Sequence, residues 1–256
     1  MQGMEDCGLF NRLPDSEVSP FSFASHFCFI HLTLQELLAA REIAKMKPSD
    51  ISDFISSNAS DPKWHLVIQF VAGLLRGKEN EAVNNFVIHL LDCLTANSSL
   101  LGEAESKQTK QKALLMLKCL YEYNDETIVM SVASELHENT NFNYEIDLSG
   151  CQVTPVECIA IANFVKHLEK PTVLSLYGNG DVSDQGVLHL CVALKNKNCQ
   201  LIKLSLEDSS ITDEGVSHLC GALKDVNCKL TEVNVHGNTI TDQGISHLCD
   251  ALKNVN

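Results

Sequence analysis

The C-terminal part of the chain repeats one pattern of hydrophobic and polar residues. In residues 201–206, apolar side chains alternate with polar ones, which is typical of a strand with one buried face. A turn follows, and the apolar residues from Val216 onwards are spaced three and four apart, which predicts a helix. Residues 230–256 repeat the pattern without a gap, so that Gly244 falls 29 residues after Gly215. Each unit is therefore predicted to contain one strand and one helix.

Two earlier stretches fit the same unit. Residues 172–200 match it with one extra residue in the turn, and residues 144–169 are a weaker first copy. A strand and a helix every 28–29 residues form the leucine-rich repeat pattern. Such units stack into a curved solenoid with a parallel sheet on the concave face and helices outside, because neither element buries its apolar face alone. We predict about four repeats over residues 141–256. No polar capping unit follows, so we expect more repeats in the natural chain, or a fragment.

Two sets of positions recur in the units and are predicted to serve packing. One lies three residues after the second strand leucine, where an Asn or Cys in this repeat class turns inward and bonds neighbouring backbone. The other is a glycine that opens the helix, where a side chain is expected to crowd the adjoining strand. The inward positions are Cys151, Asn179, Ser209 and Asn238, and the glycines are Gly186, Gly215 and Gly244.

The strand residues that do not point into the core face the concave side, where solenoids commonly bind partners. This face is mildly acidic. It is our first choice for a partner-binding site, and a merely solvated face explains the same residues equally well. The predicted concave residues are Glu145, Asp147, Tyr177, Lys203, Glu207, Asp208, Glu232 and His236.

The middle of the chain has a different period. Residues 48–140 carry apolar side chains at helical spacing throughout, and Asp61 followed by Pro62 is typical of a helix start. The lysine-rich stretch 107–112 is interpreted as a solvated helix start. The predicted fold class is thus an α-helical bundle followed by an α/β leucine-rich-repeat solenoid, with residues 1–47 as a separate N-terminal region.

The segment FCFIHLTLQELLAA interrupts an apolar run with His31. Phenylalanines of one parity before it predict a strand, and the residues after it predict a helix. Thr33 and Glu36 fit a capping box, and Leu32 and Leu37 fit the accompanying hydrophobic staple. His31 stands beside the positive end of this helix, where an anion is favoured. Core packing, capping and ligand contact are all open for it.

Composition narrows the classes of function. The chain has 33 acidic and 19 basic residues, a formal net charge of −14, which argues against nucleic-acid binding and against charge-driven docking on anionic membranes. Its N-terminus has no secretory signal, and its apolar runs are too short to span a bilayer, so we predict a cytoplasmic protein. The eleven cysteines are then expected to be reduced.

The sequence contains no recognisable catalytic or metal-binding constellation. A His-Leu-Cys triplet recurs at His189, His218 and His247, but residues two apart on a helix point in different directions, whereas zinc needs about four converging ligands. Buried, small apolar cysteines explain the recurrence better. No nucleophile elbow, phosphate-binding loop or zinc-protease motif occurs. We therefore predict no enzyme activity, no metal and no cofactor for this chain alone.

The segment around His31 resembles the end of the winged-helix domain of NOD-like receptors, which combine a NACHT nucleotide-binding domain with leucine-rich repeats. WHLVIQFVAGLLRG and LLMLKCLYEYND resemble two later segments of the receptors' helical domain. The repeats resemble the ribonuclease-inhibitor subtype found in those receptors, and the resemblance covers residues 21–256. It assigns residues 1–47 to the end of the winged helix, 48–140 to the helical domain and 141–256 to the first repeats.

The resemblance implies a cytosolic sensor of innate immunity, whose repeats sense a protein or microbial ligand and help hold the resting receptor shut. In such receptors a winged-helix histidine contacts the phosphate of ADP, and His31 matches that position. Activation would open the receptor, exchange ADP for ATP and drive homo-oligomerisation. The phosphate loop and the acidic metal-binding motif are absent here, so nucleotide is expected only in a longer receptor. The alternative is a free-standing leucine-rich-repeat adaptor or inhibitor that binds a protein through its concave face.

Overall fold

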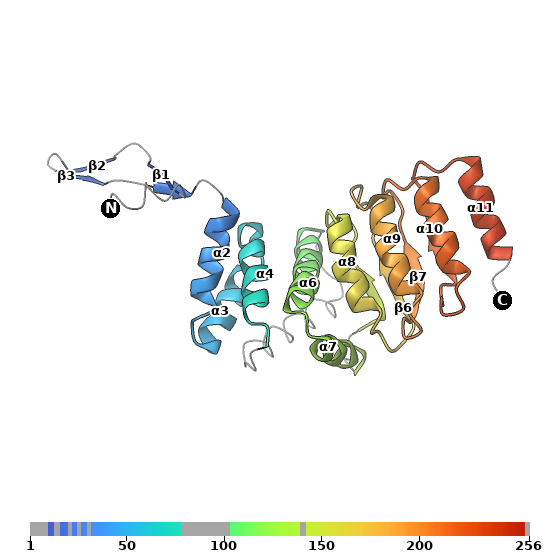
Figure 1. Cartoon of the computed structure of the whole chain (residues 1–256), viewed down its shortest axis with the longest axis horizontal. Coiled ribbons are helices and arrows are strands. Elements are labelled where there is room, and N and C mark those ends of the chain that lie inside the picture. The colour runs from blue at the N-terminus through green and yellow to red at the C-terminus, as the bar shows by residue number, and fades with distance from the viewer. Residues whose placement is uncertain are drawn as a thin grey trace.

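The computed structural model describes residues 10–12, 16–19, 22–24, 27–29, 32–77, 103–138 and 142–253. Most of its helices stand side by side in a long row, with α7 (Glu126–Glu138) lying across below it, and a parallel sheet runs along one side of the C-terminal half (Figure 1). His31 lies outside the described residues, so its predicted roles stay predictions.

Short strands and then helices make up the first half of the described chain. Strand β1 (Phe10–Arg12) pairs antiparallel with β4 (Phe27–Phe29), and β2 (Ser16–Ser19) pairs antiparallel with β3 (Ser22–Ala24). The helices that follow are α2 (Leu32–Ile43), α3 (Pro48–Asn58), the 3-10 helix η1 (Pro62–Trp64), α4 (His65–Leu74), α6 (Glu103–Tyr123) and α7 (Glu126–Glu138).

The start of α2 differs from its prediction. The pattern places Thr33 at the N-cap, but the helix begins at Leu32, so Thr33 lies within its first turn. Leu32 and Leu37 are 66% and 39% exposed and do not form a buried staple. The capping box predicted at Thr33 is wrong because the Thr-x-x-Glu spacing alone does not fix where the helix begins; with the start at Leu32, the first turn contains no acidic residue. The N-cap predicted at Asp61 is confirmed, since its carboxylate accepts a bond from the Lys63 N–H at 3.1 Å.

The predicted solenoid is confirmed. Its four strands form one parallel sheet in chain order, and a helix follows each strand along the outer side (Figure 1). The elements are β5 (Glu145–Asp147), α8 (Pro155–Val165), β6 (Thr172–Ser175), α9 (Ser183–Leu194), β7 (Leu201–Ser205), α10 (Asp213–Leu223), β8 (Glu232–Asn234) and α11 (Asp242–Lys253).

One apolar core runs through the helices and the repeats. It extends from Ala40 in α2 to Ala251 in α11, and equivalent strand residues such as Leu174 and Leu204 are almost completely buried within it. Helix α4 packs on α6, and α6 packs on α8. The helical region therefore continues the row of repeat helices and covers the first repeat.

Helix α6 is fixed to the first repeat by two lysines. Lys110 Nζ lies 2.7 Å from the Asp147 carboxylate and donates to Ser149 Oγ at 2.8 Å. Lys118 Nζ lies 2.7 Å from Glu157, near the start of α8. The predicted solvated helix start at residues 107–112 is thus wrong for Lys110, whose side chain is only 16% exposed. The reason is spatial: α6 occupies the place that a preceding repeat would take.

The inward side chains predicted for the turns bond neighbouring backbone, as expected. Asn179 is fully buried; its amide donates to the carbonyls of Leu148 and Leu176 at 2.9 and 2.8 Å, and its oxygen accepts from the Val153 N–H at 3.1 Å. It therefore joins the first repeat to the second. Asn238 joins the third to the fourth in the same way, while the shorter Ser209 makes longer bonds, 3.4 Å to the Leu176 carbonyl.

The helix-opening glycines are buried, but the crowding predicted for them comes from side chains and not from a strand. A Cβ on Gly215 would overlap Asp184 Oδ1 and lie 2.6 Å from Ile211 Cγ2. Asp184 accepts the Gly215 N–H at 2.9 Å and the Thr212 N–H at 2.8 Å. The absence of a side chain thus lets a carboxylate of one repeat reach the helix start of the next.

The same arrangement recurs one repeat later. Asp213 accepts the Thr241 N–H at 2.9 Å, and its second oxygen accepts the Thr241 hydroxyl. The hydrogen bonds from Thr241, together with one from the Gly244 N–H, lower the pKa of Asp213. In the first repeat, Thr154 and Glu157 of α8 form a capping box between themselves.

The recurring cysteines mostly pack as small apolar groups. Cys191, Cys199 and Cys220 are buried, as predicted, and burial raises the pKa of the Cys191 thiol to about 12. Cys228 is half-buried and Cys249 is exposed, so the prediction is wrong for Cys249. The reason is that α11 is the last helix of the described stack and α10 packs against it from one side alone.

Candidate functional site: the concave face of the repeats

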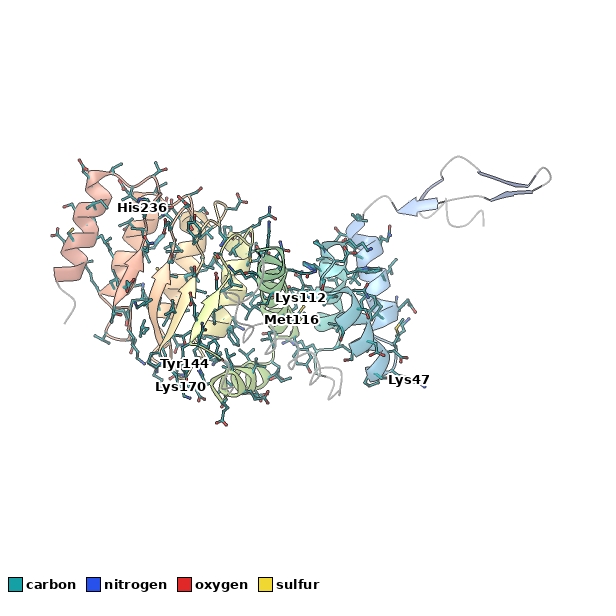
Figure 2. The ribbon with its side chains drawn as sticks, turned by 180° about the vertical axis from the view of Figure 1, so that it is seen from behind. Lys47, Lys112, Met116, Tyr144, Lys170 and His236 are labelled. Carbon is teal, nitrogen blue, oxygen red and sulfur yellow. The ribbon has the colours of Figure 1, made fainter. Side chains whose placement is uncertain are left out.

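Strand register arranges the concave side chains in rows across the sheet. One row runs through Glu145, Val173, Lys203 and Glu232, which pair in register from β5 to β8. A second row, through Asp147, Ser175, Ser205 and Asn234, is half-buried and has two small serines at its centre. A third follows where the strands end, through Tyr177, Glu207 and His236. Figure 2 shows this side of the molecule, with His236 on the last repeats.

The register brings together seven of the eight residues predicted from the sequence. Asp208 is the exception, because it lies in the turn after Glu207 with a φ of 51°. Sequence reasoning passed over Val173, Ser175, Ser205 and Asn234, although their alternation with buried residues marks the same face. The lysine at the α6 side, Lys110, had no such signal, because it reaches the sheet from another element.

Ion pairs hold several of these side chains. Lys203 Nζ lies 2.7 Å from the Glu232 carboxylate, and both side chains are about half exposed. Asp147 is more buried; burial opposes its ionisation, but the hydrogen bonds from Lys110 and Ser149 outweigh burial and lower its pKa. Two of the carboxylates on the acidic face are therefore already matched by a neighbouring ammonium.

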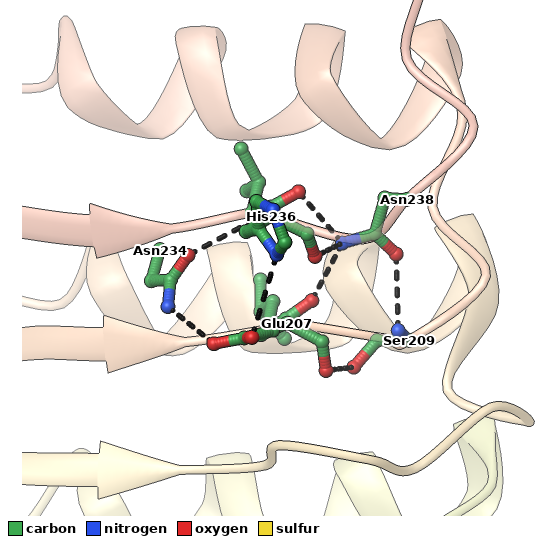
Figure 3. A network of polar contacts seen from close by, with 7 residues as sticks. Glu207, Ser209, Asn234, His236 and Asn238 are labelled. Carbon is green, nitrogen blue, oxygen red and sulfur yellow. Dashed lines mark hydrogen bonds and ion pairs between the residues drawn. The ribbon is translucent and has the colours of Figure 1, made fainter.

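Glu207 is the centre of a polar network on the last two strands (Figure 3). Its carboxylate accepts a bond from the Asn234 amide at 2.8 Å and lies 3.4 Å from His236 Nδ1. Asn234 in turn accepts the backbone N–H of His236 at 3.0 Å. These contacts fix the orientation of a carboxylate that is still 31% exposed, beside His236, which is 81% exposed.

An aromatic ring stands in the same row. Tyr177 is 48% exposed, an unusual position for a large side chain on an otherwise polar face. With Glu207 and His236 it forms a line of three different chemistries: aromatic, anionic and titratable. Tyrosine and histidine expose both an apolar ring and a hydrogen-bonding tip, which suits contact with a protein surface better than plain solvation does.

Other hollows lie outside this face. A cavity of about 210 Å³ between the helical region and the first repeat is lined by His65, Lys118, Glu157 and their neighbours. An apolar groove of about 360 Å³ runs between Leu32, Trp64 and Val67. Across the described residues we find no helix with the length and apolar character of a membrane span, and no cluster of three or more metal-ligating side chains.

Comparison with known proteins identifies the repeats. The Leucine Rich repeat family matches residues 197–220 and 226–249. NACHT, LRR and PYD domains-containing protein 9 of Bos taurus is 39% identical over 83 residues, which are 32% of this chain and 8% of that protein. NACHT, LRR and PYD domains-containing protein 14 of Homo sapiens is 38% identical over 72 residues, which are 28% of this chain and 6% of that protein. Nucleotide-binding oligomerization domain-containing protein 2 of Bos taurus is 32% identical over 96 residues, which are 38% of this chain and 9% of that protein.

The chain carries leucine-rich repeats, and it is similar over about a third of its length to proteins that combine NACHT domains with such repeats. The matched parts make up less than a tenth of each of these three relatives. The leucine-rich repeats and the solenoid fold predicted from the sequence are thereby confirmed, as is the similarity to NOD-like receptors.

Proposed function

We propose that this chain is the partner-sensing part of a cytosolic innate-immune receptor, and that the concave face makes the contact. The observation that carries this proposal is the row of Tyr177, Glu207 and His236, in which cross-strand bonds hold a partly exposed carboxylate between two exposed rings. Preorganised side chains lose less freedom on binding, so such a row favours a protein or microbial ligand. The repeats also help to hold the resting receptor shut.

The face can be tested by charge reversal. In a longer receptor that contains this chain, Glu207→Lys is expected to lower partner affinity about tenfold, a change of about 1.4 kcal/mol, because it replaces the fixed carboxylate with a cation. The readouts are basal and stimulated signalling at equal protein abundance. Glu214→Lys is the matched control, because it makes the same charge change in the same repeat but on helix α10. Equal behaviour of the two variants would contradict a role for the concave face.

We further propose that His31 contacts the phosphate of ADP in the longer receptor, where a phosphate-binding loop is supplied by residues outside this chain. The proposal is supported by the match of His31 to the winged-helix motif and by its position just before helix α2, whose N-terminus favours an anion. His31→Ala is expected to reduce ADP retention and to raise resting activity, measured on the purified receptor and in cells. Unchanged ADP retention together with unchanged resting activity would refute this role.

A further inference from the structure

Helix α7 is fastened to the first repeat at both of its ends. At its start, Glu126 lies 3.5 Å from Lys166 and 3.3 Å from His167 Nε2, in the segment that follows α8. At its last turn, His137 contacts Glu169 and Lys170, farther along the same segment. One histidine takes part at each end of α7, His167 of the following segment at its start and His137 of α7 itself at its last turn, and the two have different partners.

His137 accepts hydrogen bonds that only a neutral ring can accept. Its side chain is buried, with the residue 5% exposed. Its Nε2 accepts the backbone N–H of Glu169 at 3.0 Å and of Lys170 at 3.4 Å. An acceptor at Nε2 places the ring proton on Nδ1, which has no hydrogen-bond partner among the described residues. The bonds therefore depend on a free lone pair at Nε2.

The surroundings of His137 contain a fixed cation. Lys170 Nζ donates to the His137 carbonyl at 3.0 Å and lies 5.7 Å from the centre of the Tyr144 ring (Figure 2). Tyr144 stacks on the histidine ring at 5.9 Å, and Phe142 meets both rings edge to face. The titratable groups around His137 in the described part of the chain are thus Lys170 and Glu169 from the segment after α8, and Tyr144 from the residue just before β5.

We propose that protonation of His137 releases the end of α7 from the first repeat, so that the joint between the helical region and the solenoid loosens as the pH falls. A proton on Nε2 turns the acceptor into a donor. The new N–H at Nε2 would then point at the two backbone N–H groups whose bonds this nitrogen now accepts, and the charged ring would lie near the Lys170 ammonium. Both hydrogen bonds would be lost, and a charge would be added to a buried site next to another charge.

The direction of the pH dependence follows from burial. Burial, aided by the charge of Lys170, lowers the pKa of His137 below its ordinary value near 6.5. Between the lowered pKa and about 6.5, the released state binds more protons than the docked state. The docking contribution is therefore complete above about pH 6.5 and decreases as the pH falls towards the pKa of the docked state.

At the opposite end of α7, burial also lowers the pKa of His167, although a proton on this ring would face the Glu126 carboxylate. The charge of Glu126 opposes the effect of burial there, whereas protonation of His137 breaks two hydrogen bonds. His167 provides a control at the same joint, because the N–H groups of Glu169 and Lys170 bond to His137.

Amide hydrogen exchange of the full chain tests the proposal. The N–H groups of Glu169 and Lys170 are expected to lose about tenfold in protection between pH 7.0 and 5.5, after correction for intrinsic exchange, because release of the helix end takes up a proton. His137→Gln, whose amide oxygen accepts bonds without titrating, is expected to abolish this loss. His167→Gln is expected to retain it. Lys170→Met is expected to make the loss smaller, because it removes the repelling charge and brings the pKa of docked His137 closer to its ordinary value.

Three results would overturn the proposal. The first is unchanged protection of the two amides in the parent chain over this pH range. The second is the same loss of protection in His137→Gln as in the parent. The third is a ring proton on Nε2 at pH 7, seen in the nitrogen shifts of His137 by NMR. This measurement uses the parent chain, so it decides the question even if His137→Gln does not fold.

Discussion

Replacing Gly215 with alanine is expected to lower the free energy of unfolding of the repeats by about 2–3 kcal/mol. The new Cβ would overlap Asp184 Oδ1 and press on Ile211 Cγ2. Asp184 would have to move, and its bonds to the N–H groups of Thr212 and Gly215 would weaken. The measurement is urea unfolding followed by circular dichroism.

The matched control for this change lies on the same helix. Gly221 is exposed, and a Cβ there would meet nothing closer than Lys195 Nζ at 4.0 Å. Gly221→Ala is therefore expected to stabilise the chain by about 0.5–1 kcal/mol, because alanine loses less backbone freedom in a helix than glycine does. If both substitutions shift the unfolding midpoint in the same direction, the close approach of Asp184 is not what determines the residue at Gly215.

Asn179→Ala is expected to cost about 2–4 kcal/mol. It leaves the carbonyls of Leu148 and Leu176 and the N–H of Val153 without their partner, in a place that water does not reach. One unsatisfied buried group costs about 1–3 kcal/mol. Loss of protection against amide exchange should begin at Val153, because that N–H belongs to the first repeat and its acceptor to the second.

The control for Asn179 is an asparagine that also bridges two repeats but lies nearer the surface. Asn227 donates to the Lys195 carbonyl at 3.2 Å from a half-buried position. Asn227→Ala is expected to change the free energy of unfolding by less than about 1 kcal/mol, because water can replace the lost bond. A similar cost for the two substitutions would show that burial does not set the contribution of Asn179.

The repeats could be predicted in detail because each unit repeats the same local physics. The period placed Asn179 and Gly215 in buried positions, and alternation placed Glu207 and Tyr177 on the concave face. What periodicity cannot show is which element stands beside the first repeat. Lys110 was interpreted as solvated because its partner, Asp147, lies 37 residues further along the chain.

The same limit applies to the candidate site and to the joint. The concave residues follow from strand parity, but the fixed orientation of Glu207 depends on Asn234 of the neighbouring strand. In the sequence alone, His137 cannot be distinguished from any other polar residue near the end of an amphipathic helix. Its role becomes visible only when α7 packs on the segment after α8, where the N–H groups of Glu169 and Lys170 donate to its ring.

The carboxylates at the helix starts give the solenoid a direction. Asp184 of the second repeat supports Thr212 in the third, and Asp213 of the third supports Thr241 in the fourth. No described bond of this type runs backwards. Loss of either carboxylate would therefore leave N–H groups without their acceptor in the next repeat towards the C-terminus. Substitution of Asp184 or Asp213 is thus expected to loosen first the helix start that lies one repeat later in the chain.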